Sequence, residues 1–344
     1  MKTRSVLKIG ALLAATVTVV LTGASGAVGA PAAPAPPAGM RVLLSNDDSM
    51  QAARPDGADG IGLYELRKRL CAAGADVVVV APWAYMSGAS GAVTTGGTVS
   101  AQRRTVMPAG YQQDCAGAPS GGAVFGLCRG TSPCTPASPS ATPADTVKFA
   151  LRGGLGHLVG WRDEPDVVVT GINSGPNVSS SINDSGTVGA AIAAVDSEVP
   201  AVAFSGMIGD DLVVGRKTYE AAAEFGVRLL TRLWQRDLLS PRFALNVNYP
   251  DAARGKASRV SWTSMGTGPL AVATFAPVDA DTFTLGLGLC PADRYCPPET
   301  KRDSDTEAIR RGEVSITPIT ADRTLPGRDA DRVRAAVIGG RLPG

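Results

Sequence analysis

The sequence predicts an α/β fold: a doubly wound sheet with a more β-rich excursion toward the C-terminus. Two short segments, DVVVVA at 76–81 and DVVVT at 166–170, are β-branched or apolar after the leading aspartate. Such runs are typical of strands buried on both faces of a parallel sheet. Segments with apolar residues at helical spacing alternate with these strands along the chain, and that alternation indicates strand–helix–strand units.

The individual elements follow from the same patterns. Residues 40–45 form a short apolar run that ends in polar residues, which predicts the first buried strand, and 61–73 has helical spacing with Gly74 as a stop. The stretch 102–141 is rich in Gly, Pro, Ser and Cys, which predicts a long loop or a hairpin. The remaining predicted elements are strands at 76–81, 166–170, 201–204 and 243–248, helices at 145–151, 185–196 and 219–234, β-rich segments at 260–263, 283–287 and 314–319, and a closing helix at 328–338.

Composition excludes several classes of function. The chain has 344 residues, 44% of them hydrophobic, which supplies ample material for a core. Its 33 Lys and Arg against 31 Asp and Glu give a net charge of +2, so no strong field attracts a nucleic acid polymer. The single histidine, His157, excludes a His-rich metal site and is expected to be a surface residue. A hydrolase built from this sequence must rely on carboxylates, hydroxyls and amides.

The N-terminus has the pattern of a secretory signal peptide over residues 1–30. A basic start precedes an apolar run at 9–21, and small residues at 28–30 predict cleavage near Ala30. An N-terminal membrane anchor is the alternative. Residues 31–39 form a Pro-rich linker, and no later stretch has the length of a membrane-spanning helix. We therefore expect a secreted chain, extracellular or in the cell envelope, without a membrane partner after cleavage, whose catalytic domain covers 40–340.

The six cysteines are expected to pair if the chain is exported into an oxidising compartment. Cys290 and Cys296 are close enough in sequence to bridge a short turn in a Pro-rich loop, and we predict that pair. The other four allow three pairings and are Cys71, Cys115, Cys128 and Cys134. The alternative is that Cys71, on the apolar side of its helix, is a buried free thiol.

Polar side chains follow the ends of several predicted strands, where ligands bind in open α/β sheets. Asn46, Asp47 and Asp48 follow the first strand, and Ser87 lies in the loop after the second. The third strand is followed by a loop with Asn173 and Asn177, and then by Ser185, Gly186 and Thr187 at the start of a helix. This all-oxygen set is suited to a hard cation such as Mg²⁺ or Mn²⁺.

Each of these features also has an ordinary structural explanation. The aspartate pair could cap a helix or form a solvated turn, the asparagines are common turn formers, and the Ser-Gly-Thr sequence could be an N-cap, although the same N–H groups can bind an anion. The sequence DSDT at 303–306 imitates the aspartyl-nucleophile signature of another phosphatase superfamily. That signature requires a preceding buried strand, and the Pro-rich, charged segment 297–302 does not predict one.

At these residues the sequence closely resembles the SurE survival-protein family, which comprises metal-dependent 5′/3′-nucleotidases and acid phosphatases. The resemblance runs in the family's order from about residue 40 to 320. The matching stretches are RVLLSNDD at 41–48, VVAP at 79–82, SGAS at 87–90, PDVVVTGINSGPN at 165–177, SGTV at 185–188, LNVNYP at 245–250, Asp305 with Ala308 and Gly312, and VSITP at 314–318.

The resemblance implies a Rossmann-like domain, a β-hairpin excursion and a C-terminal extension exchanged within a homodimer or tetramer. It also implies one divalent cation per subunit, Mg²⁺ or Mn²⁺, with catalytic Asp47 and Asp48 among its ligands. Ser87 and Asn173 match the other two ligands. Phosphate is expected near Asn177 and the turn of Ser185, Gly186 and Thr187, and Asn46 is assigned to the substrate with them.

Two functions follow as expectations. The first is a secreted, metal-dependent phosphomonoesterase that hydrolyses nucleoside 5′/3′-monophosphates and other small phosphate esters, with direct attack by Asp47 on phosphorus as a minority mechanism. The second is a non-catalytic extracellular protein that binds nucleotide or phosphate. It is motivated by two departures from the family: Ser49 replaces the usual Gly, and 50–58 is an insertion beside the site.

Overall fold

The computed structural model describes residues 38–52, 60–290, 295–324 and 327–338, which belong to one compact unit that spans 35–344. The signal peptide at 1–30, nearly all of the linker at 31–39 and most of the 50–58 insertion lie outside the described residues, so the expectations about them stay predictions. No helix in the described part of the chain has the length and apolar character needed to cross a membrane.

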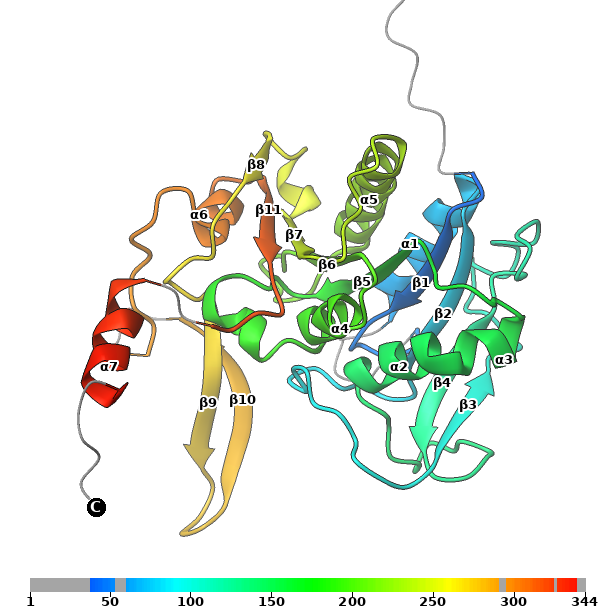
Figure 1. The fold of residues 1–344 in the computed structure, drawn as a ribbon, viewed down its shortest axis with the longest axis horizontal. Helices are drawn as coiled ribbons and strands as arrows, with labels where there is room; N and C mark the ends of the chain where they lie inside the picture. Colours follow the sequence, from blue (N-terminus) through cyan, green and yellow to red (C-terminus); the bar gives the residue numbers. More distant parts are fainter. Residues whose placement is uncertain (1–37, 53–59, 291–294, 325–326, 339–344) are drawn as a thin grey trace, which may run out of the picture. The chain divides into compact units, whose positions relative to one another are not determined.

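A nine-stranded sheet forms the centre of the described unit, in the order β3-β4-β2-β1-β5-β6-β7-β11-β8 (Figure 1). The strands from β4 to β7 in this order are mutually parallel, whereas β3 and β11 run antiparallel to β4 and β7. The bounds are β1 Arg41–Ser45, β2 Asp76–Pro82, β3 Val99–Arg103, β4 Val124–Arg129, β5 Val167–Ser174, β6 Ala201–Gly206, β7 Ala244–Tyr249, β8 Val260–Trp262 and β11 Val314–Ile319.

Helices cover both faces of this sheet. Val42 and Leu44 of β1 belong to one apolar cluster and Leu43 to another, because successive side chains of a strand point to opposite faces. The first cluster includes residues of α1 (Ile61–Ala72) and α5 (Arg216–Gln235), and the second those of α2 (Pro143–Phe149), α3 (Leu155–Val159) and α4 (Gly186–Val195). A kink at Ala150–Gly154, where Arg152 and Gly153 have non-helical backbone dihedral angles, joins α2 to α3. The predicted doubly wound α/β sheet is confirmed.

The strand order places a topological switch point between β1 and β5. From β1 the chain proceeds to β2 and β4 on one side and later returns to β5 on the other side of β1. Crossover connections leave opposite sides at such a point, so the loops at the carboxyl ends of the two strands separate and leave room for a ligand. Asp47 and Asp48 follow β1, and Asn173 lies near the end of β5.

Several elements differ from the sequence-based expectation. The 102–141 stretch contains β4, which pairs with the antiparallel β3, so the hairpin alternative holds. Helix α2 begins at Pro143, two residues early, because Thr142 and Asp145 form a capping box. The elements that the sequence did not predict include β3, α3, β9 (Ala271–Pro277), α6 (Asp305–Arg310) and the short 3₁₀ turns Ser179–Asn183 and Ala252–Arg254.

The C-terminal excursion is a separate two-stranded ribbon, followed by two helices (Figure 1). Strand β9 pairs antiparallel with β10 (Phe283–Leu289) and makes no ladder with the main sheet in the described residues. After α6 and β11, helix α7 covers Arg328–Ile338, as predicted. The β9–β10 ribbon is the β-hairpin that the family resemblance implies.

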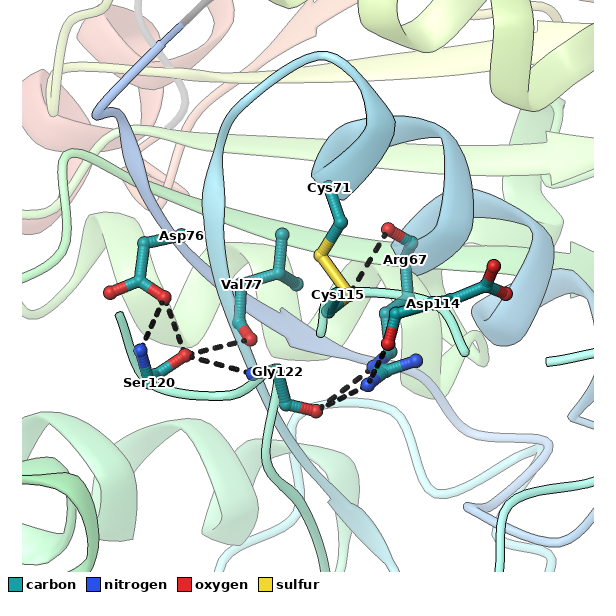
Figure 2. Close-up of a disulfide and its surroundings, with 8 residues drawn as sticks. All are labelled: Arg67, Cys71, Asp76, Val77, Asp114, Cys115, Ser120 and Gly122. Atoms are coloured by element: carbon teal, nitrogen blue, oxygen red, sulfur yellow. Dashed lines mark hydrogen bonds between the residues drawn. A yellow bond between two sulfur atoms is a disulfide. The ribbon is translucent and has the colours of Figure 1, made fainter. Parts of the chain in front are cut away.

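All six cysteines are paired. Cys290 bonds to Cys296, as predicted. The other two disulfides join Cys71 to Cys115 and Cys128 to Cys134, so the alternative of a free thiol at position 71 is wrong. Figure 2 shows that the Cys71–Cys115 bond ties α1 to the loop between β3 and β4.

Candidate active site

Asp47 lies at the carboxyl end of β1 and is held by the first turn of α4. Its side chain is 2% exposed. Thr187 donates twice to its carboxylate: the hydroxyl to Oδ1 at 2.6 Å and the backbone N–H to Oδ2 at 3.0 Å. Burial raises the pKa of Asp47, and the hydrogen bonds from Thr187 oppose that rise. A cation beside this carboxylate would hold it ionised.

Asp48 and Asn173 complete a group of oxygens around the switch point. The backbone N–H of Ser174 donates to Asp48 Oδ2 at 2.9 Å, and the Thr187 hydroxyl lies 3.2 Å from Asn173 Oδ1. The side chain of Asn173 is therefore next to the hydroxyl that contacts Asp47. The two aspartates contact neighbouring elements, β5 and α4, so the chain turns at the end of β1 as a shared site requires.

A bulge in β5 sets the position of Asn173. The pairing of β5 with β6 shifts register between Thr170 and Asn173, and such a bulge re-aims the side chains that follow it. Gly171 permits it, because its φ is +118° and a Cβ there would lie 2.2 Å from the Phe204 carbonyl oxygen. Only glycine fits this position.

The loop that carries Ser87 runs past both the aspartate pair and the start of α4. The N–H of Met86 donates to the Asp47 carbonyl at 2.8 Å, and the N–H of Ser90 donates to the Asp184 carbonyl at 3.1 Å. Ser87 follows Met86 directly and is half-buried. The loop thus brings the Ser87 backbone alongside Asp47, where a serine ligand is expected.

Asn46 contributes a buried amide oxygen without a hydrogen-bond partner. Its Nδ2 donates to the Ser49 carbonyl at 2.9 Å, whereas Oδ1 is unpartnered within the described structure. Ser49 has φ +84°, in the left-handed region that favours Gly, and its hydroxyl accepts from Gln51 N at 3.1 Å. With Ser at this position, both aspartates are hydrogen-bonded to neighbouring elements.

The donor set fits a hard cation. The described residues contain no group of three or more His, Cys, Asp and Glu that could hold a metal. A cation at this place would be bound by two carboxylates together with neutral hydroxyl and amide oxygens. Oxygen-only ligands of this kind suit Mg²⁺ or Mn²⁺ and exclude a zinc site of the thiolate or imidazole type.

The start of α4 has a different set of contacts from those that the sequence suggests. Ser185 is the N-cap, and its hydroxyl accepts from Val188 N at 3.1 Å. A Cβ on Gly186 would lie 2.8 Å from the Asp47 Cβ, so this residue must be small. Both Thr187 donors, which were expected for phosphate, are engaged with Asp47, since a helix N-terminus attracts the nearest anion. Thr187 therefore orients Asp47, a role that the sequence does not reveal.

Asn177 belongs to a neighbouring cluster of buried amides. Its N–H donates to Asn248 Oδ1 at 2.7 Å and its Nδ2 to Ser205 Oγ at 2.9 Å, while its carbonyl accepts from Asn246 and Asn248. These partners were missed by sequence reasoning, although two asparagines at alternate positions of a fully buried strand were an available signal. The cluster fixes the loop after β5 to the ends of β6 and β7.

Asp305 fixes the same loop from the other side. Its buried carboxylate accepts from Ser179 N at 3.1 Å and from Gly266 N at 2.8 Å. Burial raises the pKa of Asp305. Ser304 caps α6 through Glu307 N, which agrees with rejecting 303–306 as a nucleophile signature. His157 is exposed on α3.

Fold and site together define an α/β protein with a carboxylate-based cation site at a topological switch point. The family model described as Survival protein SurE matches residues 42–271, and the chain belongs to the SurE family. The 5′-nucleotidase SurE of Stenotrophomonas maltophilia is 32% identical over 295 residues, which cover 83% of this chain and 91% of that protein. The 5′/3′-nucleotidase SurE of Yersinia pestis is 31% identical over 288 residues, with coverage of 83% and 91%.

The fold is also similar to a solved structure. The SurE protein from Aquifex aeolicus superposes with a TM-score of 0.61 at 22% identity, covering 87% of this chain and 99% of that one. This likeness supports the Rossmann-like fold.

Proposed function

We propose that this protein is a nucleotidase of the SurE type, a metal-dependent hydrolase that releases phosphate from nucleoside 5′- or 3′-monophosphates and from other small phosphate esters. Family membership and the names of the relatives support the reaction. The observation that carries the proposal is the pair of buried carboxylates at the β1–β5 switch point, each hydrogen-bonded to a different neighbouring element.

The residues of the site have distinct roles in this reaction. Asp47, Asp48, Ser87 and Asn173 would hold one Mg²⁺ or Mn²⁺ ion, which supplies a Lewis acid for the phosphoryl group. Thr187 keeps Asp47 in one orientation through its two hydrogen bonds, and Ser174 N does the same for Asp48. We propose that substrate phosphate is oriented near Asn46, whose Oδ1 has no hydrogen-bond partner within the described structure, and near Asn177, Ser185 and Gly186.

The decisive assay uses the chain that begins after Ala30, with AMP, 3′-AMP and p-nitrophenyl phosphate, in the presence of Mg²⁺, Mn²⁺ or EDTA. Metal-dependent phosphate release supports the enzyme, and the panel reports the preferred ester. Binding of nucleotide without product release would instead favour the extracellular binding protein. The hydrogen bonds of Asp47 and Asp48 support the enzyme, because both carboxylates are held at the switch point although Ser49 follows them.

Replacing Thr187 by Val tests the start of α4. The substitution keeps the shape of the side chain but removes the hydroxyl that donates to Asp47, so we expect about tenfold weaker Mn²⁺ affinity together with lower turnover. Inhibition by inorganic phosphate is measured in parallel at saturating Mn²⁺. Weaker inhibition would assign the helix start to phosphate binding as well, whereas unchanged metal affinity would contradict the orienting role of Thr187.

Export of the mature chain is part of the proposal. The basic and apolar pattern of residues 1–30 and the presence of three disulfides support it, because such bonds persist in oxidising compartments. Mass spectrometry of protein from the culture medium or cell envelope should find a chain that begins near Pro31 with no alkylatable thiol. Recovery of a full-length, reduced chain in the cytoplasm would contradict export.

The β9–β10 ribbon supports assembly with a second copy of the chain. Phe275 lies opposite Leu285 and Ala273 opposite Leu287, so one face of the ribbon is apolar. Leu287 is 78% exposed. An isolated two-stranded ribbon is only marginally stable, and exposed apolar faces mark interfaces. The occupant is the equivalent ribbon of a homodimer, or of a tetramer built from two dimers.

Substituting Leu285 and Leu287 together by Lys should break this assembly. Two buried charges in an apolar interface are costly, so we expect light scattering to report the mass of one chain instead of two or four. Thr284→Lys is the matched control, since it places a charge on the opposite face of the same strand. A wild-type chain that is monomeric, or a double variant that still dimerises, would contradict the ribbon interface.

A further inference from the structure

The turn that follows the aspartate pair is held by two donors on one carbonyl. Met50 is buried, and its carbonyl oxygen accepts from the Tyr64 hydroxyl at 2.5 Å and from Arg104 Nη1 at 2.9 Å. Burial raises the pKa of Tyr64 to about 12, so its hydroxyl keeps the proton that it donates. The backbone N–H of Met50 is held as well, because it donates to the Pro82 carbonyl.

The Arg104 side chain has little freedom. Its Nε donates to the Val106 carbonyl at 2.8 Å, and Nη1 also reaches Gln51 Oε1 at 3.2 Å. The guanidinium stands 5.8 Å from the centre of the Tyr64 ring. Arg104 thus contacts two consecutive residues of the turn, Met50 and Gln51, from outside the site. A planar guanidinium with several donors is suited to holding backbone and side-chain oxygens together.

The segment 104–122 that begins with Arg104 is anchored to α1 along its length. Tyr111 donates to Glu65 Oε1 at 2.5 Å, and Cys115 is bonded to Cys71. Figure 2 shows the far end, where the buried Arg67 donates to the Gly122 carbonyl. Helix α1 also begins beside the turn, because Gly60 N donates to the Gln51 carbonyl. The contacts of segment 104–122 with α1 therefore hold Arg104 next to Met50.

We propose that Arg104 is a positioning residue for the cation site: by holding the Met50 carbonyl it fixes the turn at 48–50 and so sets Asp47 and Asp48 for the metal. The inference rests on the proposed function for its metal but assigns a residue outside the ligand set. Partners that orient metal ligands typically change affinity 10–100-fold when they are removed. Arg104 acts through the backbone and touches neither the metal nor the substrate.

The test compares Arg104→Ala, Arg104→Lys and the control Arg103→Ala by titrating each metal-free protein with Mn²⁺ in a calorimeter. Arg103 is the adjacent, exposed arginine, and its guanidinium is near the Phe125 ring. We expect about tenfold weaker Mn²⁺ binding for Arg104→Ala, recovery to within about threefold for Arg104→Lys, and no change for Arg103→Ala. At saturating Mn²⁺ the kcat of Arg104→Ala should return to within a few-fold of wild type.

Thermal unfolding without metal separates positioning from stability. Wild-type Mn²⁺ affinity in Arg104→Ala would overturn the proposal, whatever happens to its Tm. Arg104→Met provides the second variant if Arg104→Ala does not fold, because it keeps a long unbranched side chain but removes the Nη1 donor to Met50 and Gln51. Weaker Mn²⁺ binding supports the proposal, and unchanged binding overturns it. A wild-type chain that binds Mn²⁺ but hydrolyses no ester would refute the proposed function and leave the binding comparison decisive for Arg104.

Discussion

Replacing Asp47 by Asn is expected to lower turnover at least about 10³-fold, the loss that follows when several kcal/mol of metal stabilisation is removed. Asp47 is one of the two carboxylates at the switch point, and the amide also presents an NH₂ group to one of the two Thr187 donors. Because burial already disfavours the charged carboxylate, the exchange for a neutral amide should leave Tm without metal close to wild type. Initial rates with AMP and p-nitrophenyl phosphate measure the effect.

Two further measurements make the Asp47 prediction specific. Added Mn²⁺ should raise the Tm of wild type, because a ligand that binds only the folded state stabilises it, and that rise should disappear in Asp47→Asn. Asp76→Asn is the matched control. Asp76 is also a buried carboxylate, but it starts β2 at the opposite end of the sheet and binds Ser120. Near-normal activity of Asp47→Asn, or an equal loss in the control, would refute the assignment.

The parts of the fold that could be predicted are those whose burial leaves a continuous signal. Strands β2 and β5 are β-branched runs that are buried on both faces, and no other local structure explains such a run. The sequence did not predict β4 as a separate strand, because Gly126 and Cys128 interrupt its run of β-forming residues. Helix α6 has only six residues, too few for helical periodicity to be detected, and it depends on its Ser304 cap and on the buried Asp305.

The candidate site was predictable to the extent that strand ends converge. Asp47 and Asp48 follow β1 and Asn173 lies near the end of β5. Both strands are central in the sheet, so the meeting of these residues follows from topology. The hydrogen-bond donors that hold these side chains could not be predicted from the strand order. Thr187 is 140 residues from Asp47 in sequence, and Arg104 is 54 residues from Met50. A sequence pattern identifies which face a residue lies on, but not which distant carbonyl or carboxylate its side chain meets.

Of the three disulfides, the Cys71–Cys115 bond is expected to contribute most to the free energy of unfolding. It closes a loop with a sequence separation of 44, so replacing both cysteines by Ala should lower the free energy of unfolding by about 4 kcal/mol in the loop-closure model. For a domain of this size that corresponds to a Tm lower by about 6 °C. The bond also attaches segment 104–122 to α1, and Arg67 of α1 binds the same segment at Gly122 (Figure 2).

The Cys128–Cys134 bond is the matched control, because its separation of 6 predicts a loss of only about 2.2 kcal/mol when both residues become Ala. Urea unfolding of wild type and the two double variants measures the difference, and the loss on reduction of wild type with dithiothreitol should exceed their combined loss, because it also breaks the Cys290–Cys296 bond. Equal losses for the two pairs would show that loop length does not decide their contributions. In that case the contacts of segment 104–122 with α1, which involve Tyr111 and Arg67, would hold the segment without the covalent bond.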